Sequence, residues 1–291
     1  MTDRWPLSAF GDEVAVDLED QVEALQSLGI AGVEVRTAWG TGVVDLDREQ
    51  LARAARVLRE GGIGVSAIGS PVGKAPIDGD PGDEPARLLR AIRAAEAFGT
   101  RLIRVFSFFV EGAYEGRRDE VLRRMAALAR EAERAGVVLV HENESYIYGD
   151  TPERTLDILR SVGSPALRAA FDPANFVQVG VEAPFTTGWP LLREHVAHVH
   201  IKDAVPVDRA GGDPYPAPPP PGALMAAVRP AGEGRGQLRE LLRALADEGY
   251  EGYLTLEPHL AGRLPDLDER GRMEVAAGAL RGLLGDVPAR S

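Results

Sequence analysis

The 291-residue sequence contains no cysteine, which excludes disulfide bonds, metal sites built on thiolates, and cysteine nucleophiles. Any metal ion must therefore bind oxygen and imidazole ligands. Lysine is nearly absent too: it occurs only at Lys74 and Lys202, whereas arginine is abundant. Because all other strongly basic side chains are arginine, these two lysines are candidates for a specific role.

The sequence also lacks a long apolar run and a secretion signal. No segment approaches the roughly 20 apolar residues that span a bilayer, and residues 1–10 show no basic region followed by an apolar one. Acidic side chains outnumber basic ones by 45 to 33, and the resulting formal net charge of −12 repels the phosphate backbone of nucleic acids. We therefore predict a cytoplasmic protein that binds neither membranes nor nucleic acid.

What the sequence does contain is a regular alternation of short apolar runs with amphipathic segments, whose apolar residues recur three and four positions apart. This alternation is typical of βα units on a parallel sheet. The predicted strands are Leu7–Phe10, Gly32–Arg36, Gly64–Ile68, Leu102–Phe106, Val137–Glu142, Arg168–Asp172, Ala197–Ile201 and Tyr253–Glu257. The predicted helices include Leu18–Leu28, Gln50–Arg59, Arg87–Phe98, Glu120–Ala135, Leu238–Asp247 and a last helix near Arg272–Leu284.

Eight such strands predict a closed α/β barrel. No Gly-rich dinucleotide-binding turn follows the first strand, which argues against an open, doubly wound sheet. A (β/α)8 TIM barrel commonly occupies about 250 residues as one unit, so we predict a single TIM-barrel domain over residues 1–291. A Pro-rich loop insertion at 205–222 follows the seventh strand, and the sequence fits an ordered lid and a flexible insert equally well.

Four consecutive predicted strands end in possible metal ligands: Glu142, Asp172, His200 and Glu257. The carboxyl ends of barrel strands meet at one face, where the active sites of TIM barrels form. Three unpaired carboxylates converging there would repel one another, and a divalent cation is the simplest compensation. The oxygen-rich ligand set predicts one divalent metal ion, with Mn²⁺ favoured and Mg²⁺, Co²⁺ or Zn²⁺ as alternatives.

Side-chain alternation along a strand separates these ligands from nearby histidines. If Glu142 points into the barrel, His141 faces the helices. If His200 points inward, His198 lies two residues deeper on the same face, and we interpret it as a packed, hydrogen-bonded interior side chain. His259 lies beyond its strand and is interpreted either as a neighbour of the ligands or as a surface residue.

These residues and their spacing resemble the xylose-isomerase-like barrels, in particular the sugar phosphate isomerase/epimerase group, which includes ketose 3-epimerases and inosose dehydratases. The resemblance covers nearly the whole chain. Its motifs are Gly11-Asp12-Glu13, Gly32-Val-Glu-Val-Arg36, a spaced glutamate, Asp-x-x-Asn, His-x-His-x-Lys-Asp, Gly232-Glu233-Gly234 and Gly252-Tyr-Leu-Thr-Leu-Glu257. It implies that the four strand-end residues bind the metal and that the two glutamates among them also move protons.

The resemblance implies a metal-dependent isomerase or epimerase that acts on a keto-sugar or related polyol. Glu142 and Glu257 would remove and return a proton, from opposite faces, at the carbon α to the carbonyl. The alternative is a metal-dependent dehydratase, a lyase acting on a keto-polyol such as an inosose, which starts with the same proton abstraction and then expels water. The expected partner is a small-molecule carbohydrate substrate, and a homo-oligomer is left open.

Six further residues are predicted to bind substrate: Arg36, Lys74, Asn175, Lys202, Asp203 and Glu233. Asn175 replaces the histidine that ketose epimerases commonly carry three residues after the aspartate ligand, so the sugar itself is left open. Several have a structural alternative: Lys202 as an ion-pair partner of Asp203 or Glu233, Arg36 as part of a buried ion pair, and Lys74 as a surface residue.

Two other function classes fit less well. The endonuclease branch of the same superfamily uses a trinuclear zinc cluster and needs several more histidines than the five present, none of which precedes His141. A non-catalytic sugar-binding barrel would be indicated by the loss of Glu142 or Glu257, and both are present.

Overall fold

A computed structural model describes residues 4–80, 83–112, 114–207 and 222–287. Its eight main strands are all parallel and close into a barrel, in which each strand neighbours the next one along the chain. They are β1 (Leu7–Phe10), β2 (Gly32–Val35), β5 (Gly64–Ile68), β6 (Leu102–Val105), β7 (Val138–Glu142), β8 (Leu167–Phe171), β9 (Val196–Ile201) and β12 (Leu254–Leu256). The predicted TIM barrel is confirmed, and each strand end differs from its predicted position by at most one residue.

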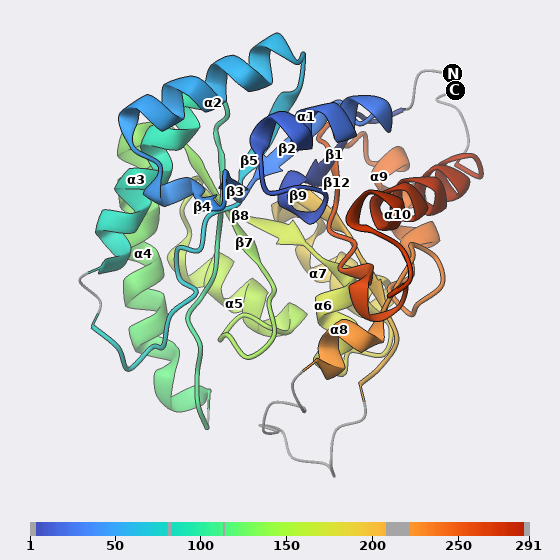
Figure 1. The fold of residues 1–291 in the computed structure, drawn as a ribbon. Coiled ribbons are helices and arrows are strands. Elements are labelled where there is room, and N and C mark those ends of the chain that lie inside the picture. Colours follow the sequence, from blue (N-terminus) through green and yellow to red (C-terminus); the bar gives the residue numbers. More distant parts are fainter. Residues whose placement is uncertain (1–3, 81–82, 113, 208–221, 288–291) are drawn as a thin grey trace.

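Helices surround the barrel on the outside (Figure 1). They are α1 (Leu18–Ser27), α2 (Arg48–Glu60), α3 (Asp83–Phe98), α4 (Arg118–Ala135), α5 (Pro152–Val162), α6 (Pro173–Gln178), α7 (Pro184–Leu192), α8 (Ala223–Ala227), α9 (Leu238–Asp247) and α10 (Glu269–Leu284). Short 3-10 turns lie at Gly11–Glu13, Val43–Asp45, Glu115–Arg117, Arg193–His195 and Leu260–Gly262. No helix in the described part of the chain has both the length and the apolar character to cross a membrane.

Local sequence signals set the helix ends. The Asp47 side chain accepts a hydrogen bond from the backbone N–H of Gln50, and Oε1 of Gln50 accepts one from the backbone N–H of Asp47, so a capping box begins α2. Thr151 begins α5 by accepting a hydrogen bond from the backbone N–H of Arg154 and is followed by Pro152, whose φ suits a first helical position. At the other end of α5, Gly163 adopts the left-handed conformation that stops a helix.

The strands divide their side chains between an apolar outer face and a polar interior. Outward residues such as Val33, Ile103 and Val199 join one large apolar cluster with the helices, and burying each of them contributes about 1.5–3 kcal/mol. The residues that alternate with them include Glu34 and Arg104, which are also buried. A rigid outer layer thus supports a charged barrel interior.

Loops at the carboxyl end of the barrel form small sheets of their own. β3 (Thr37–Ala38) pairs with β4 (Thr41–Gly42), and β10 (Asp203–Ala204) pairs with β11 (Val228–Arg229). The loops after β5, β6 and β7 are joined through single bridges at Phe109. Residues 208–221 of the predicted Pro-rich insertion at 205–222 lie outside the described residues.

Candidate metal centre

The four predicted metal ligands lie together at the carboxyl end of the barrel. Glu142 is the last residue of β7, Asp172 and Glu257 directly follow β8 and β12, and His200 is the last but one residue of β9. These four strands are adjacent in the barrel, in the order β12, β9, β8, β7. One ligand atom from each residue lies within 4.8 Å of the other three, and all four residues are buried.

The spacing of the ligand atoms fits a divalent cation. Nδ1 of His200 lies 3.4 Å from Oε1 of Glu142. The same nitrogen lies 3.9 Å from Oε2 of Glu257 and 4.0 Å from Oδ2 of Asp172. Among the described residues, this nitrogen has no hydrogen-bond partner, whereas Asp172 Oδ2 forms an ion pair with Lys202. Atoms that bind one ion at about 2.0–2.2 Å lie about 3–4 Å apart, so the residues present suit such an ion.

Burial and neighbouring cations shift the pKa values of the three carboxylates in the cluster in different directions. Burial raises the pKa of Asp172 to about 6, against the opposing effect of Lys202. Burial acts in the same direction on Glu142, but His200 outweighs it and lowers the pKa of Glu142 to about 2. At Glu257, too, burial is outweighed, and Lys202 holds its pKa well below the usual value. The two glutamates are therefore ionised at neutral pH.

Lys202 lies between two of the predicted ligands. Its Nζ is 2.8 Å from Oδ2 of Asp172 and 2.8 Å from Oε2 of Glu257. The alternative of a pair with Asp203 or Glu233 is therefore wrong, because side-chain alternation after β9 brings the ammonium into the barrel instead. Burial lowers the pKa of Lys202, but the Asp172 carboxylate outweighs burial and raises this pKa well above its usual value.

Arg104 of β6 is a buried cation that the sequence analysis missed. Its Nη1 lies 3.2 Å from Oε2 of Glu142 and 3.7 Å from Oε1 of Glu257. The guanidinium group lies 4.9 Å from the ring centroid of Phe10 and 5.0 Å from that of Phe106. A signal was available, because an arginine inside an apolar strand must find a partner in the barrel.

Two predicted substrate contacts lie beside the ligands. Nδ2 of Asn175 donates a hydrogen bond of 3.0 Å to Oε1 of Glu142, and the backbone N–H of Asn175 donates to Oδ1 of Asp172, which begins α6. Arg36 is part of an ion-pair network, as its structural alternative predicted. Its Nε lies 2.8 Å from Oδ2 of Asp12 and its Nη1 lies 3.4 Å from Oε1 of Glu257.

Three other predicted contacts lie outside the cluster. Asp203 accepts hydrogen bonds from four backbone N–H groups, those of Ala204, Gly232, Gly234 and Gly236. Its carboxylate thus binds the loop before α9, and we do not retain its predicted substrate role. Glu233 belongs to that loop and is exposed. Lys74 lies near the loop after β7, where its Nζ is 2.9 Å from Oε2 of Glu144.

His141 and His198 follow the predicted alternation. His141 faces the helix layer, since its ring lies against Gly149 before α5. His198 is buried and bonds Oε2 of Glu34 at 2.8 Å. His259 is a neighbour of the ligands rather than a surface residue: its Nε2 lies 3.4 Å from Oε1 of Glu257.

Comparisons with known proteins agree with this fold. The family model for the xylose isomerase-like TIM barrel matches residues 22–281. No curated protein matches the sequence significantly. Among solved structures, the IOLI protein with a binding zinc atom gives a TM-score of 0.74 at 16% identity, covering 98% of this chain and 100% of that one.

Two further solved structures are similar. The probable 3-DHS dehydratase AsbF from Bacillus anthracis gives a TM-score of 0.71 at 18% identity, covering 94% of this chain and 98% of that one. An L-ribulose 3-epimerase gives 0.68 at 17% identity, covering 97% and 95%. At these identities the likeness shows the fold, and the match of the family model over most of the chain shows that this protein belongs to the xylose isomerase-like TIM-barrel family.

Proposed function

We propose that this protein is a divalent-metal-dependent isomerase or epimerase of a keto-sugar or related polyol. The observation that carries the proposal is the pair Glu142 and Glu257, two ionised carboxylates that belong to one candidate cation site and come from strands separated by β8 and β9. The similarity to an L-ribulose 3-epimerase and to a zinc-binding neighbour supports it. The proposed metal ligands are Glu142, Asp172, His200 and Glu257.

When bound, the ion would act as a Lewis acid that polarises the substrate carbonyl. The chain's own residues would move the proton. Glu142 is held by Asn175 at one oxygen and by Arg104 at the other, while Glu257 is held by Lys202 and Arg36. A carboxylate fixed in this way keeps its position as it gains and loses a proton.

The two glutamates reach the site from different strands, so one can take a proton from one face of the substrate and the other can return it to the opposite face. Return to the same carbon gives an epimer, and return to the neighbouring carbon gives an isomer. Asn175, Arg36 and Lys202 are the neighbouring polar groups proposed to bind the substrate hydroxyls.

A dehydratase is the second candidate, and Lys202 favours it. Its buried ammonium lies 2.8 Å from Oε2 of Glu257. A protonated amine next to the proton-abstracting carboxylate can donate a proton to a departing hydroxyl group. The structural neighbour described as a probable 3-DHS dehydratase supports this alternative.

The test is isotope exchange. The protein is loaded with Mn²⁺ and incubated with a panel of ketoses and inososes in D₂O, after which the metal is removed and deuterium at the α carbon is measured by mass spectrometry. Glu142→Gln and Glu257→Gln should slow exchange by about 10²–10⁴-fold. Glu274→Gln, an exposed glutamate in α10, serves as the matched control. A product with new ultraviolet absorption would select the dehydratase, and no exchange with any substrate would contradict both.

A further inference from the structure

Glu34 is a buried acid whose strand lies across the barrel from the strands that carry the proposed ligands. It lies in β2, which pairs with β1 and β5 and not with β9, and it is 0% exposed. A buried carboxylate is costly unless other groups compensate its charge. The proposed function gives this residue no role, so the groups that it contacts must explain it.

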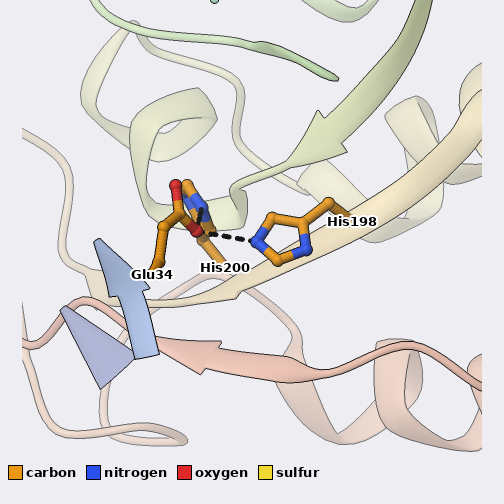
Figure 2. A group of neighbouring side chains, drawn as sticks. All are labelled: Glu34, His198 and His200. Atoms are coloured by element: carbon orange, nitrogen blue, oxygen red, sulfur yellow. Dashed lines mark hydrogen bonds and ion pairs between the residues drawn. The ribbon is translucent and has the colours of Figure 1, made fainter. Parts of the chain in front are cut away.

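The partners of Glu34 are the two interior histidines of β9 (Figure 2). Its Oε2 lies 2.8 Å from Nε2 of His198 and 3.1 Å from Nε2 of His200. Because the same carboxylate oxygen lies within hydrogen-bond distance of both ring nitrogens, it accepts from each, and each ring carries a proton on the Nε2 that faces Glu34.

We infer that Glu34 is a positioning residue for the proposed metal centre: by accepting from Nε2 of His200, it directs the other nitrogen, Nδ1, to the cation. This inference rests on the proposed function and goes beyond its ligand set. A histidine binds a metal through a nitrogen without a proton, and Nδ1 is the nitrogen that faces the carboxylates, 3.4 Å from Glu142. A carboxylate behind a ligand histidine fixes the ring and makes its free nitrogen more basic.

The surroundings keep Glu34 and the ring of His200 in place. Nε of Arg104 lies 3.8 Å from Oε1 of Glu34, so the guanidinium group attracts the second oxygen of this carboxylate. The ring of His200 packs edge-on against Phe10 and against His198, at centroid distances of 5.4 and 5.1 Å. These contacts hold the ring so that Nε2 faces Glu34 and Nδ1 faces the proposed ligands.

The first test measures Zn²⁺ affinity by competition with a chromophoric chelator. Glu34→Gln should bind Zn²⁺ about 10–100-fold more weakly than wild type, because its amide can donate to Nε2 and thereby favour a proton on Nδ1. The matched control is Glu84→Gln. It alters another buried carboxylate, which contacts Arg87 and the backbone of Gly73, and it should leave the affinity unchanged.

The second test locates the proton in the wild-type protein and does not need a variant that folds. In Zn²⁺-loaded protein with ¹⁵N-labelled histidine, NMR should find the His200 proton on Nε2 and the metal on Nδ1. The opposite assignment would overturn the role of Glu34, as would a Glu34→Gln affinity within about twofold of wild type. Wild-type protein that binds no Zn²⁺ would instead overturn the proposed metal centre, and the role of Glu34 would fall with it.

Discussion

Asn143 and Asp172 exchange two hydrogen bonds between the ends of β7 and β8. Nδ2 of Asn143 donates to the carbonyl oxygen of Asp172 at 2.8 Å, and the N–H of Asp172 donates to Oδ1 of Asn143 at 3.0 Å. Because Asn143 directly follows Glu142 and is buried, this pair fixes the backbones that carry two proposed ligands. A side chain outside the proposed ligand set thus fixes the separation of two strand ends that carry proposed ligands.

Asn143→Ala should therefore weaken both folding and metal binding. Leaving buried backbone groups without partners costs about 1–3 kcal/mol of unfolding free energy, and the freed strand ends should lower Zn²⁺ affinity. Asn143→Asp retains the acceptor for the N–H of Asp172 but loses the donor, so its affinity should be intermediate. Urea denaturation and Zn²⁺ competition measure the two effects, and an unchanged affinity in both variants would contradict the expectation.

Asp172→Asn and Asp203→Asn form a matched pair of buried aspartates with opposite expected effects. The first should abolish stoichiometric metal binding, since it neutralises a proposed ligand. The second should keep the metal but lower the unfolding free energy by about 2–4 kcal/mol, because four backbone N–H groups lose a charged acceptor. Metal analysis after gel filtration and chemical denaturation distinguish them. Loss of metal from Asp203→Asn would argue against its structural role.

Metal removal should lower the free energy of unfolding by an amount that grows with the logarithm of the metal affinity. A ligand that binds only the folded state adds about 2.7 kcal/mol at a free concentration 100 times its Kd. Thermal denaturation with excess Mn²⁺ and with a chelator should therefore differ, with the higher midpoint in Mn²⁺. Asp172→Asn provides the control, since its midpoint should not respond to either addition. Equal midpoints for wild type in both conditions would count against the metal centre.

Alanine substitutions at two glycines with positive φ should distinguish the cost of steric crowding from the cost of backbone strain. At Gly73, φ is +80° and a Cβ would lie 2.0 Å from the carbonyl oxygen of Phe106, whereas at Gly62 φ is +63° with no atom within 4 Å. Gly62→Ala should cost only the left-handed penalty of about 1–2 kcal/mol. Gly73→Ala should cost clearly more, because the loop after β5 must move. Equal costs in urea denaturation would show that this loop is not closely packed.

Asp157, which lies outside the proposed metal centre, should make the free energy of unfolding depend on pH. Its carboxylate accepts hydrogen bonds from Arg118 and Tyr148, and the Arg118 bonds lower its pKa. Since the native pKa lies below the unfolded value, the stabilisation is complete above about pH 4 and is lost as the pH falls toward the native pKa. The difference in unfolding free energy between wild type and Asp157→Asn should therefore shrink between pH 7 and pH 3, and a constant difference would contradict this.

The order of strands, their bounds and the identity of the four proposed ligands followed from the sequence alone. The reason is local: strand and helix periodicities depend on neighbouring residues, and parallel strands in a barrel must bring their carboxyl ends to one face. Glu142, Asp172, His200 and Glu257 each stand at such an end, so closure of the barrel brings them together whatever the details of packing.

Only the tertiary structure decided which charged groups meet across the barrel. Glu34 and His198 are separated by 164 positions, and no periodicity links β2 to β9. The partners of Arg104 and Lys202, and the binding of Asp203 to backbone amides, depend in the same way on how the strands tilt and stagger as the barrel closes. The sequence shows that these buried charges need partners, and the closed barrel determines which partners lie within reach.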